Sequence, residues 1–328
     1  MIVTDQQAQN FEKFINSYDF FFISGHKDPD GDSISSALGV AEILKAKGKH
    51  YQLISVGPFK KTEIKKFEKL FISELPKRLL SKPNAALIQV DCSEINRIGN
   101  GFCDLLKDYP TFIIDHHKTA EATLDNSIIY ADSPAAVFLI QQLYEKLVGK
   151  PDKKLAEILF FGICTDTGFF KFLGENTSPV FDGVSRLVSY GANPRKTYSD
   201  ISSGKPFSTR QLFATVLART KQYCKGKLLV TYETLEDTQK LGKNGRDTDA
   251  LYDMLLSTEG AKATIFLRQE SETNCTVGFR SKDDIDVSVI AAKFGGGGHK
   301  NASGLSIEGK IEDIAPKIIA EFESVFAS

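Results

Sequence analysis

Short apolar runs alternate with longer amphipathic segments between residues 19 and 190 of the chain. The apolar runs predict buried strands, at residues 20–23, 51–56, 85–90, 111–114 and 127–131. The amphipathic segments predict helices at residues 33–46 and 135–147, and Pro134 is well placed for the first turn of the second helix. This alternation predicts an α/β fold in which a parallel sheet carries helices on both faces.

A second pattern begins after two turn-rich stretches, residues 191–194 and 202–206, and we place a linker over residues 191–207. Beyond it, strands are expected at residues 228–232, 263–268 and 275–280, and helices at residues 248–256, 287–294 and 314–326. We therefore expect a first domain over residues 1–190 and a smaller α/β domain over residues 208–328. The second domain is expected to pack across a cleft from the first, and clefts between domains are usual ligand sites.

Acidic and histidine side chains follow the apolar runs of the first domain. The first run leads into His26-Lys27-Asp28-Pro29-Asp30-Gly31-Asp32, which places three carboxylates and an imidazole in seven residues. The later clusters are Asp91, Asp115-His116-His117, and Asp166, which follows an apolar stretch at residues 158–164 that we group with the strands. Because ligands bind beyond the carboxyl ends of parallel strands, these clusters are expected to form one site.

The composition of these clusters indicates a metal site. Carboxylates this close repel one another and hold protons unless a cation neutralises them. Divalent metals take oxygen ligands, and imidazole shifts the choice toward Mn, Fe, Co or Zn. A calcium EF-hand is excluded, because counting from Asp28 the sixth position is Ser33 instead of Gly and the twelfth is Gly39 instead of Glu. Taken singly, Asp91 is also compatible with a helix cap and the histidine pair with a surface pair, but the four clusters together favour a metal.

A run of glycines in the second domain indicates an anion site. The run comprises Gly295, Gly296, Gly297 and Gly298, and His299 and Lys300 follow it. Consecutive glycines cost backbone entropy, but they let main-chain N–H groups approach an anion closely. A flexible loop is the alternative. Arg268 and Arg280 each end a predicted strand, and a guanidinium suits a phosphate or a base, although Arg268 is also compatible with a plain surface charge.

These motifs, in this order, resemble the signature of a known superfamily. His26-x-x-x-Asp30-x-Asp32, Asp91, Asp115-His116-His117 and Asp166 resemble the four motifs of the DHH phosphoesterases, and residues 295–299 resemble the glycine-histidine loop of the DHH-associated domain. The Arg280-Ser281 pair also matches relatives. The resemblance covers nearly the whole chain and is strongest to the bacterial nanoRNase type, which hydrolyses short oligoribonucleotides to mononucleotides and 3'-phosphoadenosine-5'-phosphate to AMP.

The resemblance implies a metal-dependent phosphoesterase with two divalent ions, Mn²⁺ being expected and Mg²⁺ or Co²⁺ being alternatives. It implies that one ion is held by His26 and Asp30, and that Asp91 bridges the ions as a catalytic residue. The ligands implied for the second ion are Asp32, His116 and Asp166. His117 is then a catalytic residue that contacts the scissile phosphate or acts in acid–base support.

The resemblance also assigns residues around the metals and in the second domain. The substrate-binding residues that it implies are Arg280, Ser281, Gly295, Gly296, Gly297, Gly298 and His299, with short single-stranded RNA and a nucleoside bisphosphate as substrates. Arg268 is added to this group from its residue type and its position at a strand end. Asp28 and Asp115 are expected to orient ligands, and Arg97 resembles a family arginine to which we assign no role. Residues 135–139 depart from the family pattern, which places substrate contacts from that helix in doubt.

Composition limits the partners. A net charge of −1 gives no basic field for long nucleic acid, so a nucleic acid substrate is expected to be short. Five scattered Cys without a Cys-x-x-Cys pair fit a reducing cytoplasm. No apolar run approaches a membrane span, so no membrane partner is expected. A homodimer is expected only from the general frequency of two-fold assemblies.

Four other functions stay open at this point. A RecJ-like single-strand exonuclease is disfavoured by the absence of a basic surplus, and a manganese inorganic pyrophosphatase by the glycine-histidine loop. Hydrolysis of linear dinucleotides in cyclic-dinucleotide turnover differs from the nanoRNase function only in its substrate. A non-catalytic nucleotide sensor is disfavoured because every expected ligand is present.

Overall fold

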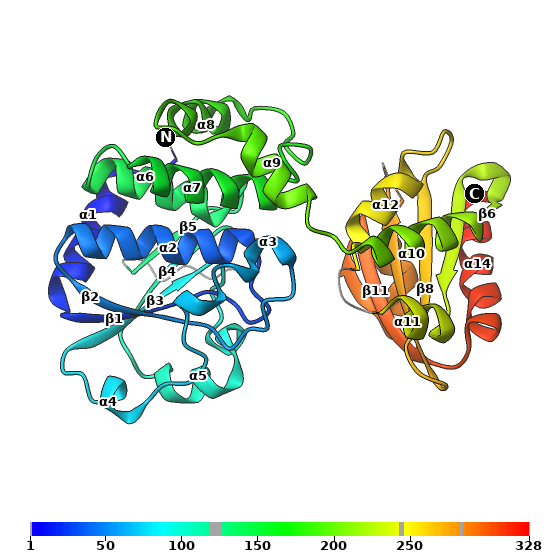
Figure 1. The fold of residues 1–328 in the computed structure, drawn as a ribbon, viewed down its shortest axis with the longest axis horizontal. Helices are drawn as coiled ribbons and strands as arrows, with labels where there is room; N and C mark the ends of the chain where they lie inside the picture. The colour runs from blue at the N-terminus through cyan, green and yellow to red at the C-terminus, as the bar shows by residue number, and fades with distance from the viewer. Residues whose placement is uncertain (1, 118–125, 243–245, 283–284, 328) are drawn as a thin grey trace. The chain divides into compact units, whose positions relative to one another are not determined.

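The computed structural model describes residues 2–117, 126–242, 246–282 and 285–327. The chain divides into two compact units, Met1–Gly204 and Lys205–Ser328, and each unit has its own sheet and its own apolar core (Figure 1). The α/β fold class predicted from the sequence is confirmed in both units. The cleft expected between the two domains stays a prediction.

Within the described residues, the first unit holds a sheet of five parallel strands in the order β2-β1-β3-β4-β5. The strands are β1 (Phe20–Ser24), β2 (His50–Ile54), β3 (Ala85–Val90), β4 (Thr111–Asp115) and β5 (Ser127–Ile129). Each strand lies within, or within one residue of, an apolar run predicted to form one. The parallel order places the carboxyl ends of β1, β3 and β4 side by side at one edge.

Helices cover both faces of this sheet (Figure 1). The helices in the described part of this unit are α1 (Asp5–Ser17), α2 (Gly31–Ala46), α3 (Thr62–Lys65), α4 (Lys77–Leu80), α5 (Asn100–Leu106), α6 (Ala136–Leu147), α7 (Lys153–Asp166), α8 (Ser178–Ser189) and α9 (Pro194–Ser202). Side chains of β1 alternate between the faces: Phe21 and Ile23 join the core under α1, α2, α6 and α7, while Phe20 and Phe22 join the core under α5. A strand buried on both faces reads as a continuous apolar run, which is why β1 was readily predicted.

The apolar stretch at residues 158–164 is a helix, and its grouping with the strands was wrong. It forms half of α7. This helix begins after Asp152, whose carboxylate accepts a hydrogen bond of 2.8 Å from the backbone N–H of Leu155. α7 packs against α2, α6 and α8, so it is apolar on more than one side. Hydrophobic periodicity alone does not separate such a buried helix from a buried strand.

Two segments near helix ends have a local structure that the sequence did not indicate. Residues 191–207, where we place the linker, contain the helix α9, which packs on α7 and buries Thr197, and the linker itself stays a prediction. Its turn-like residues are start signals: Asn193 caps the helix and Pro194 is its first residue. Pro134 lies before Ala135, the N-cap of α6, and therefore outside the first turn of that helix.

The second unit holds, in its described part, a sheet of six strands in the order β10-β11-β9-β8-β7-β6. The strands are β6 (Lys221–Tyr223), β7 (Leu228–Glu233), β8 (Ala263–Gln269), β9 (Asn274–Ser281), β10 (Gly297–His299) and β11 (Ala302–Glu308), and the helices are α10 (Phe207–Ala218), α11 (Leu235–Leu241), α12 (Thr248–Leu256), α13 (Val287–Lys293) and α14 (Ile311–Ala327). β7 and β8 pair in parallel, and the other pairs are antiparallel. α10 and α12 pack on one face, and α13 and α14 on the other.

All three strands and all three helices expected in this unit are present, and α14 begins three residues before the expected position. β10 and β11 were not expected; β10 is glycine-rich and carries no apolar alternation, and β11 has only Leu305 and Ile307 as large apolar residues. Among the described residues of both units, no helix combines the length and the apolar character that crossing a membrane requires.

Gly162 on α7 gives a test of the helix packing. A Cβ at this position would lie 2.6 Å from Cβ of Ser35 on α2, so Gly162→Ala must push the two helices apart. We expect a loss of about 1–3 kcal/mol in the free energy of unfolding, measured by urea titration, although Ala favours a helix more than Gly does. Gly101→Ala on α5 is the matched control, because its Cβ would meet no described atom within 4 Å. Equal shifts of the two variants would contradict the packing.

Candidate metal centre

The acidic and histidine clusters converge where β1, β3 and β4 end. Asp91, directly after β3, lies between two imidazoles. Nε2 of His26 is 3.3 Å from its Oδ2 atom, and Nε2 of His116 is 3.4 Å from its Oδ1 atom. The two oxygens of one carboxylate therefore face two different histidines, which is the arrangement required of a ligand that bridges two ions.

The remaining carboxylates divide between the two imidazoles. Oδ1 of Asp30 lies 3.9 Å from Nε2 of His26. Oδ2 of Asp32 and Oδ2 of Asp166 lie 3.7 and 3.5 Å from Nε2 of His116. Among the described residues, the ligand atoms of three groups lie within 4.8 Å of one another: His26, Asp30 and Asp91; Asp32, His116 and Asp166; and Asp91, His116 and His117. The structure thus brings all six predicted metal ligands together in overlapping groups.

Backbone carbonyls orient both imidazoles. Nδ1 of His26 lies 2.7 Å from the carbonyl oxygen of Lys27, and Nδ1 of His116 lies 3.1 Å from that of Ser133. Each Nδ1 donates its hydrogen to a carbonyl, so each Nε2 is the ring atom that faces the carboxylates. Metal-binding histidines are commonly held in this way.

Asp32 is held by the N-terminus of a second helix. Its Oδ2 accepts a hydrogen bond of 2.7 Å from the N–H of Ala136, and its Oδ1 accepts one of 2.8 Å from the N–H of Val137. No described side chain within α6 caps these donors, so Asp32 on α2 satisfies them instead. The side chains of Ala135 and Ala136 are fully buried, so they do not reach a substrate from solvent.

Gly31 allows α2 and α7 to meet at the site, and the sequence analysis gave it no role. A Cβ on Gly31 would lie 2.3 Å from Oγ1 of Thr165, so the start of α2 reaches the end of α7 only without a side chain here. This close approach brings Asp30 and Asp32 to Asp166. In the sequence, the position of Gly31 between Asp30 and Asp32, at the start of a predicted helix, could have indicated this close approach.

Asp115 is placed to orient His117. Its Oδ1 accepts hydrogen bonds from Nδ1 of His117 at 2.7 Å and from the backbone N–H groups of His116 and His117 at 2.8 and 3.2 Å. Asp115 is fully buried, and its Oδ2 has no hydrogen-bond partner among the described residues. The contact fixes the ring of His117 and leaves its Nε2 atom for another partner.

Asp28 and Arg97 also lie near the site, one without the role expected for it and the other with a role not assigned from the sequence. Asp28 is half exposed and pairs with Lys60 at 2.5 Å, outside the ligand groups, so the structure does not support an orienting role for it. Arg97 contributes through its backbone: its carbonyl oxygen accepts a 2.7 Å hydrogen bond from the N–H of Lys27. This bond holds the loop that carries His26.

Burial and mutual repulsion shift the pKa values of the carboxyl groups. Burial raises the pKa of Asp32 well above its ordinary value, and the charges of Asp91 and Asp166 raise it further. Burial also raises the pKa of Asp166, to about 6. Burial alone would raise the pKa of Asp91 too, but its hydrogen bonds from His116 and His26 outweigh burial and lower it to about 2.

At the imidazoles, burial and the neighbouring carboxylates shift the pKa in opposite directions. Burial disfavours their protonation, but the hydrogen bond and charge of Asp91 outweigh it and raise the pKa of His26 to about 9. Asp91 and Asp32 together raise the pKa of His116 to about 10 despite burial. Without a metal, protons on these rings supply the positive charge that the carboxylates require. A donor set of carboxylate oxygens and imidazole nitrogens fits a divalent ion such as Mn²⁺.

The predicted substrate-binding arginines share one face of the second sheet. β8 and β9 pair with Arg268 opposite Thr276 and Arg280 opposite Thr264, which places both guanidinium groups on the face that α10 and α12 cover. The Arg280 guanidinium lies 4.5 Å from the ring centroid of Tyr252, and Arg268 donates a 3.2 Å hydrogen bond to Oγ1 of Thr276.

The other predicted substrate residues are part of tight backbone turns. The hydroxyl of Ser281 is buried and donates a 2.6 Å hydrogen bond to the carbonyl oxygen of Ile285. Gly297 and Gly298 belong to β10, and a Cβ on Gly298 would lie 2.6 Å from the carbonyl oxygen of Ala302. His299 ends β10 and is exposed. At Gly298, glycine is therefore required by the hairpin itself, and the anion-binding role predicted for the run stays a prediction.

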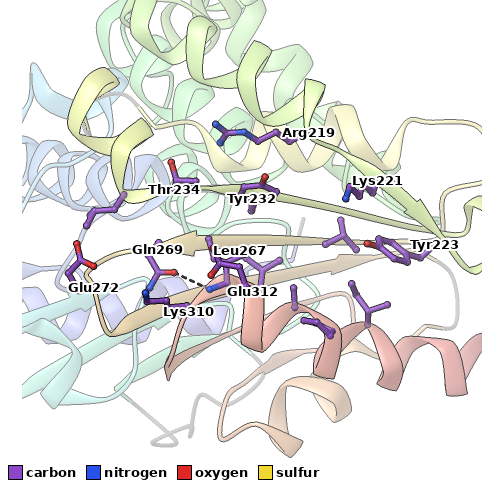
Figure 2. A pocket seen from close by; sticks show the side chains of 16 residues that line it. Arg219, Lys221, Tyr223, Tyr232, Thr234, Leu267, Gln269, Glu272, Lys310 and Glu312 are labelled. Atoms are coloured by element: carbon purple, nitrogen blue, oxygen red, sulfur yellow. Dashed lines mark hydrogen bonds between the residues drawn. The ribbon is translucent and has the colours of Figure 1, made fainter.

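A cavity of about 410 Å³ in the second unit lies on the opposite face of its sheet (Figure 2). Leu267 and Gln269, which flank Arg268 along β8, line it together with Tyr232 of β7. The first half of α14 closes it, and the predicted substrate-binding residues are not among its described lining. The cavity is therefore separate from the face that carries Arg268 and Arg280.

Comparison with known proteins places the chain in a family. Residues 21–163 match the model of the DHH family, N-terminal domain, and residues 225–328 match that of the DHHA1 domain. A curated relative from Thermus thermophilus, a bifunctional oligoribonuclease and PAP phosphatase NrnA, is 30% identical over 92% of this chain and 88% of its own length. The chain belongs to the DHH family.

Two other relatives extend the comparison. The cyclic-di-AMP phosphodiesterase PdeA of Listeria monocytogenes is 27% identical over 89% of this chain, which spans 45% of that protein. The crystal structure of an exopolyphosphatase-related protein from Bacteroides fragilis matches 100% of this chain and 99% of that chain with a TM-score of 0.87 and 23% identity. This last likeness extends the shared fold over both units of the DHH protein.

Competition between protons and metal predicts a pH dependence of metal binding. A divalent ion requires neutral imidazoles, so protons on His26 and His116, with metal-free pKa values of about 9 and 10, must leave when it binds. We expect Mn²⁺ affinity to rise as the pH rises from 6 to 9, and calorimetry in buffers of different ionisation enthalpy to detect proton release at pH 7. Affinity that is flat with pH, without proton release, would contradict the histidine assignment.

Proposed function

We propose that this DHH protein is a metal-dependent phosphodiesterase and phosphatase of the nanoRNase type. Its substrates are short oligoribonucleotides, which it hydrolyses to mononucleotides, and 3'-phosphoadenosine-5'-phosphate, which it hydrolyses to AMP. The observation that carries the proposal is the position of Asp91, whose two oxygens face His26 and His116 separately. The likeness to the Thermus oligoribonuclease over most of both chains supports the choice of substrate class.

Two divalent ions fit the donor set. His26 and Asp30 would hold one ion, Asp32, His116 and Asp166 would hold the other, and Asp91 is placed to serve both. Burial and, after it, repulsion between the carboxylates raise the pKa of Asp32 and Asp166. Four carboxylates against two divalent cations give a site close to neutral, which removes that repulsion. Bound there, the ions supply an activated water at neutral pH and positive charge for the phosphoryl oxygens.

The residues of the chain complete the chemistry. Asp115 accepts the Nδ1 hydrogen of His117, so Nε2 of His117 is the atom available for a proton transfer to or from the phosphate ester. His117 is about one-third exposed, and its ring lies 5.0 Å from that of His116. His117 is therefore close enough to the metal-binding residues to contact a phosphate bound at the ions.

The second unit supplies the remaining substrate contacts in this proposal. Arg280 and Arg268 offer planar guanidinium groups for a phosphate or a base, and the exposed His299 follows the glycine run. Both substrates carry a phosphate ester on a ribose 3' oxygen, so one mechanism serves both. A cytoplasmic location agrees with the five cysteines, all of which are unpaired.

A second candidate is the hydrolysis of linear dinucleotides produced in cyclic-dinucleotide turnover. The likeness to a cyclic-di-AMP phosphodiesterase favours it, although the chain spans less than half of that protein. The chemistry at the metals is the same, and only the preferred substrate differs.

Hydrolysis of a 5'-labelled RNA length series, from the dinucleotide to long single strands, tests the proposal directly. With Mn²⁺ present, we expect the shortest RNAs to release mononucleotides fastest, and 3'-phosphoadenosine-5'-phosphate to yield AMP in a parallel assay. A preference for long strands would indicate an exonuclease of another type, and a preference for linear dinucleotides from cyclic-dinucleotide turnover would favour the second candidate.

Two aspartate variants serve as controls for this assay. Asp91→Ala removes the shared ligand, and we expect activity to fall by more than about a hundredfold. Asp28→Ala lies in the same acidic segment but outside the ligand groups, so it should keep nearly full activity. Equal losses in both variants would show that disruption of the segment, and not loss of a metal ligand, is responsible.

A further inference from the structure

The loop that follows Asp166 has an unusual backbone. Gly168, Phe169 and Phe170 are three consecutive residues with positive φ, of 56°, 56° and 73°. Such angles are unfavourable for phenylalanine, and residues held in them concentrate at functional sites. The loop follows α7 directly, and α7 ends on one of the candidate metal ligands.

Hydrogen bonds to the end of α7 hold this loop in place. The N–H of Phe169 donates to the carbonyl oxygen of Cys164 at 2.7 Å, and the N–H of Phe170 donates to Oγ1 of Thr167 at 3.0 Å. The N–H of Phe172 donates to the carbonyl oxygen of Thr167 at 3.0 Å. The main chain at Phe172 is therefore hydrogen-bonded to Thr167, the residue that directly follows Asp166.

The three phenylalanines of the loop have different surroundings. Phe169 packs on Phe160 and Tyr198 with ring centroids 6.3 and 5.2 Å apart, and Phe170 packs on Phe160 and on Phe181, 5.6 Å away. Phe172 lies outside this aromatic cluster, and 67% of its surface is exposed. Two rings thus anchor the loop, and the third is presented to solvent.

The exposed ring of Phe172 packs against the backbone of Gly168. A Cβ on Gly168 would lie 2.5 Å from Cε2 of Phe172, so the ring rests against the backbone two residues beyond Asp166. The ammonium group of Lys171 lies 4.6 Å from the centroid of the same ring. A flat apolar surface with a cation beside it matches a nucleobase and the phosphate attached to it.

We propose that Phe172 is a base-stacking platform, which holds one base of a short oligonucleotide while a neighbouring phosphate lies at the metal centre. The inference rests on the proposed function and adds a specificity-determining residue to it. Because every base has a π face, the platform accepts any base and favours the larger purines. A substrate without a base at this position loses the contact.

The test compares Phe172→Leu with the same substitution at Phe207, the first residue of α10, which is 77% exposed and lies outside the aromatic cluster. For a dinucleotide with both bases, we expect Phe172→Leu to raise KM about tenfold and to leave kcat within about twofold, since stacking affects binding and not the metals. Phe172→Trp should restore the KM of the original protein. Phe207→Leu should change neither constant.

Base-free substrates separate stacking from a structural effect. Two dinucleotides, each lacking one of the two bases, are compared with the intact dinucleotide. On one of them the original protein and Phe172→Leu should have the same KM, which identifies the stacked base. An equal rise of KM in Phe172→Leu on all three substrates would overturn the proposal.

A binding measurement keeps this inference separate from the proposed function. Stacking quenches the fluorescence of 2-aminopurine, so a dinucleotide carrying this base at the stacked position should lose fluorescence on binding the original protein or Phe207→Leu, and keep it with Phe172→Leu. Quenching that depends on Phe172 supports the platform even if no dinucleotide is hydrolysed, in which case the proposed function alone fails. Quenching that is identical in the two Leu variants overturns the platform.

Discussion

The concentration of carboxylates around Asp91 is the constraint on which the first unit depends. Asp32 and Asp91 are almost completely buried, and Asp30 and Asp166 lie within hydrogen-bond or ion-pair range of the same imidazoles. Burial of so much negative charge is unfavourable unless positive charge accompanies it. The histidines supply it as protons in the absence of metal, and the raised pKa values of His26 and His116 express this compensation.

The fold supplies several supports for this charge cluster. The N-terminus of α6 donates two backbone hydrogen bonds to Asp32, and backbone carbonyls fix both imidazole rings. Gly31 lets α2 approach α7 closely enough for ligands from both helices to meet. Asp91 itself has a positive φ of 55°, an unfavourable conformation that places its carboxylate between the two histidines.

The sequence was sufficient to predict the parallel strands and the residues at their ends. β1 is a nearly continuous apolar run and β3 is one interrupted only by Gln89, and the carboxyl ends of parallel strands share an edge. Resemblance to a family, and not spacing, indicated how the ligands divide between two ions. α7 was not recognised as a helix, because a helix buried among other helices has the same apolar run as a buried strand.

Other features depend on contacts between distant segments, which a single sequence does not reveal. The hydrogen bonds from α6 to Asp32 join residues more than 100 positions apart. The close approach of Gly31 to Thr165 and the pairing of Asp28 with Lys60 likewise follow from tertiary packing. β10 was missed because glycines give no alternating pattern, although they were recognised as functionally suggestive.

Anomalous diffraction at the manganese edge, from crystals grown with Mn²⁺, shows whether Asp91 is shared by two ions. We expect two peaks separated by the carboxylate of Asp91, one beside His26 and Asp30 and the other beside His116 and Asp166. A single peak, or peaks that do not contact Asp91, would contradict the sharing of Asp91 by two ions.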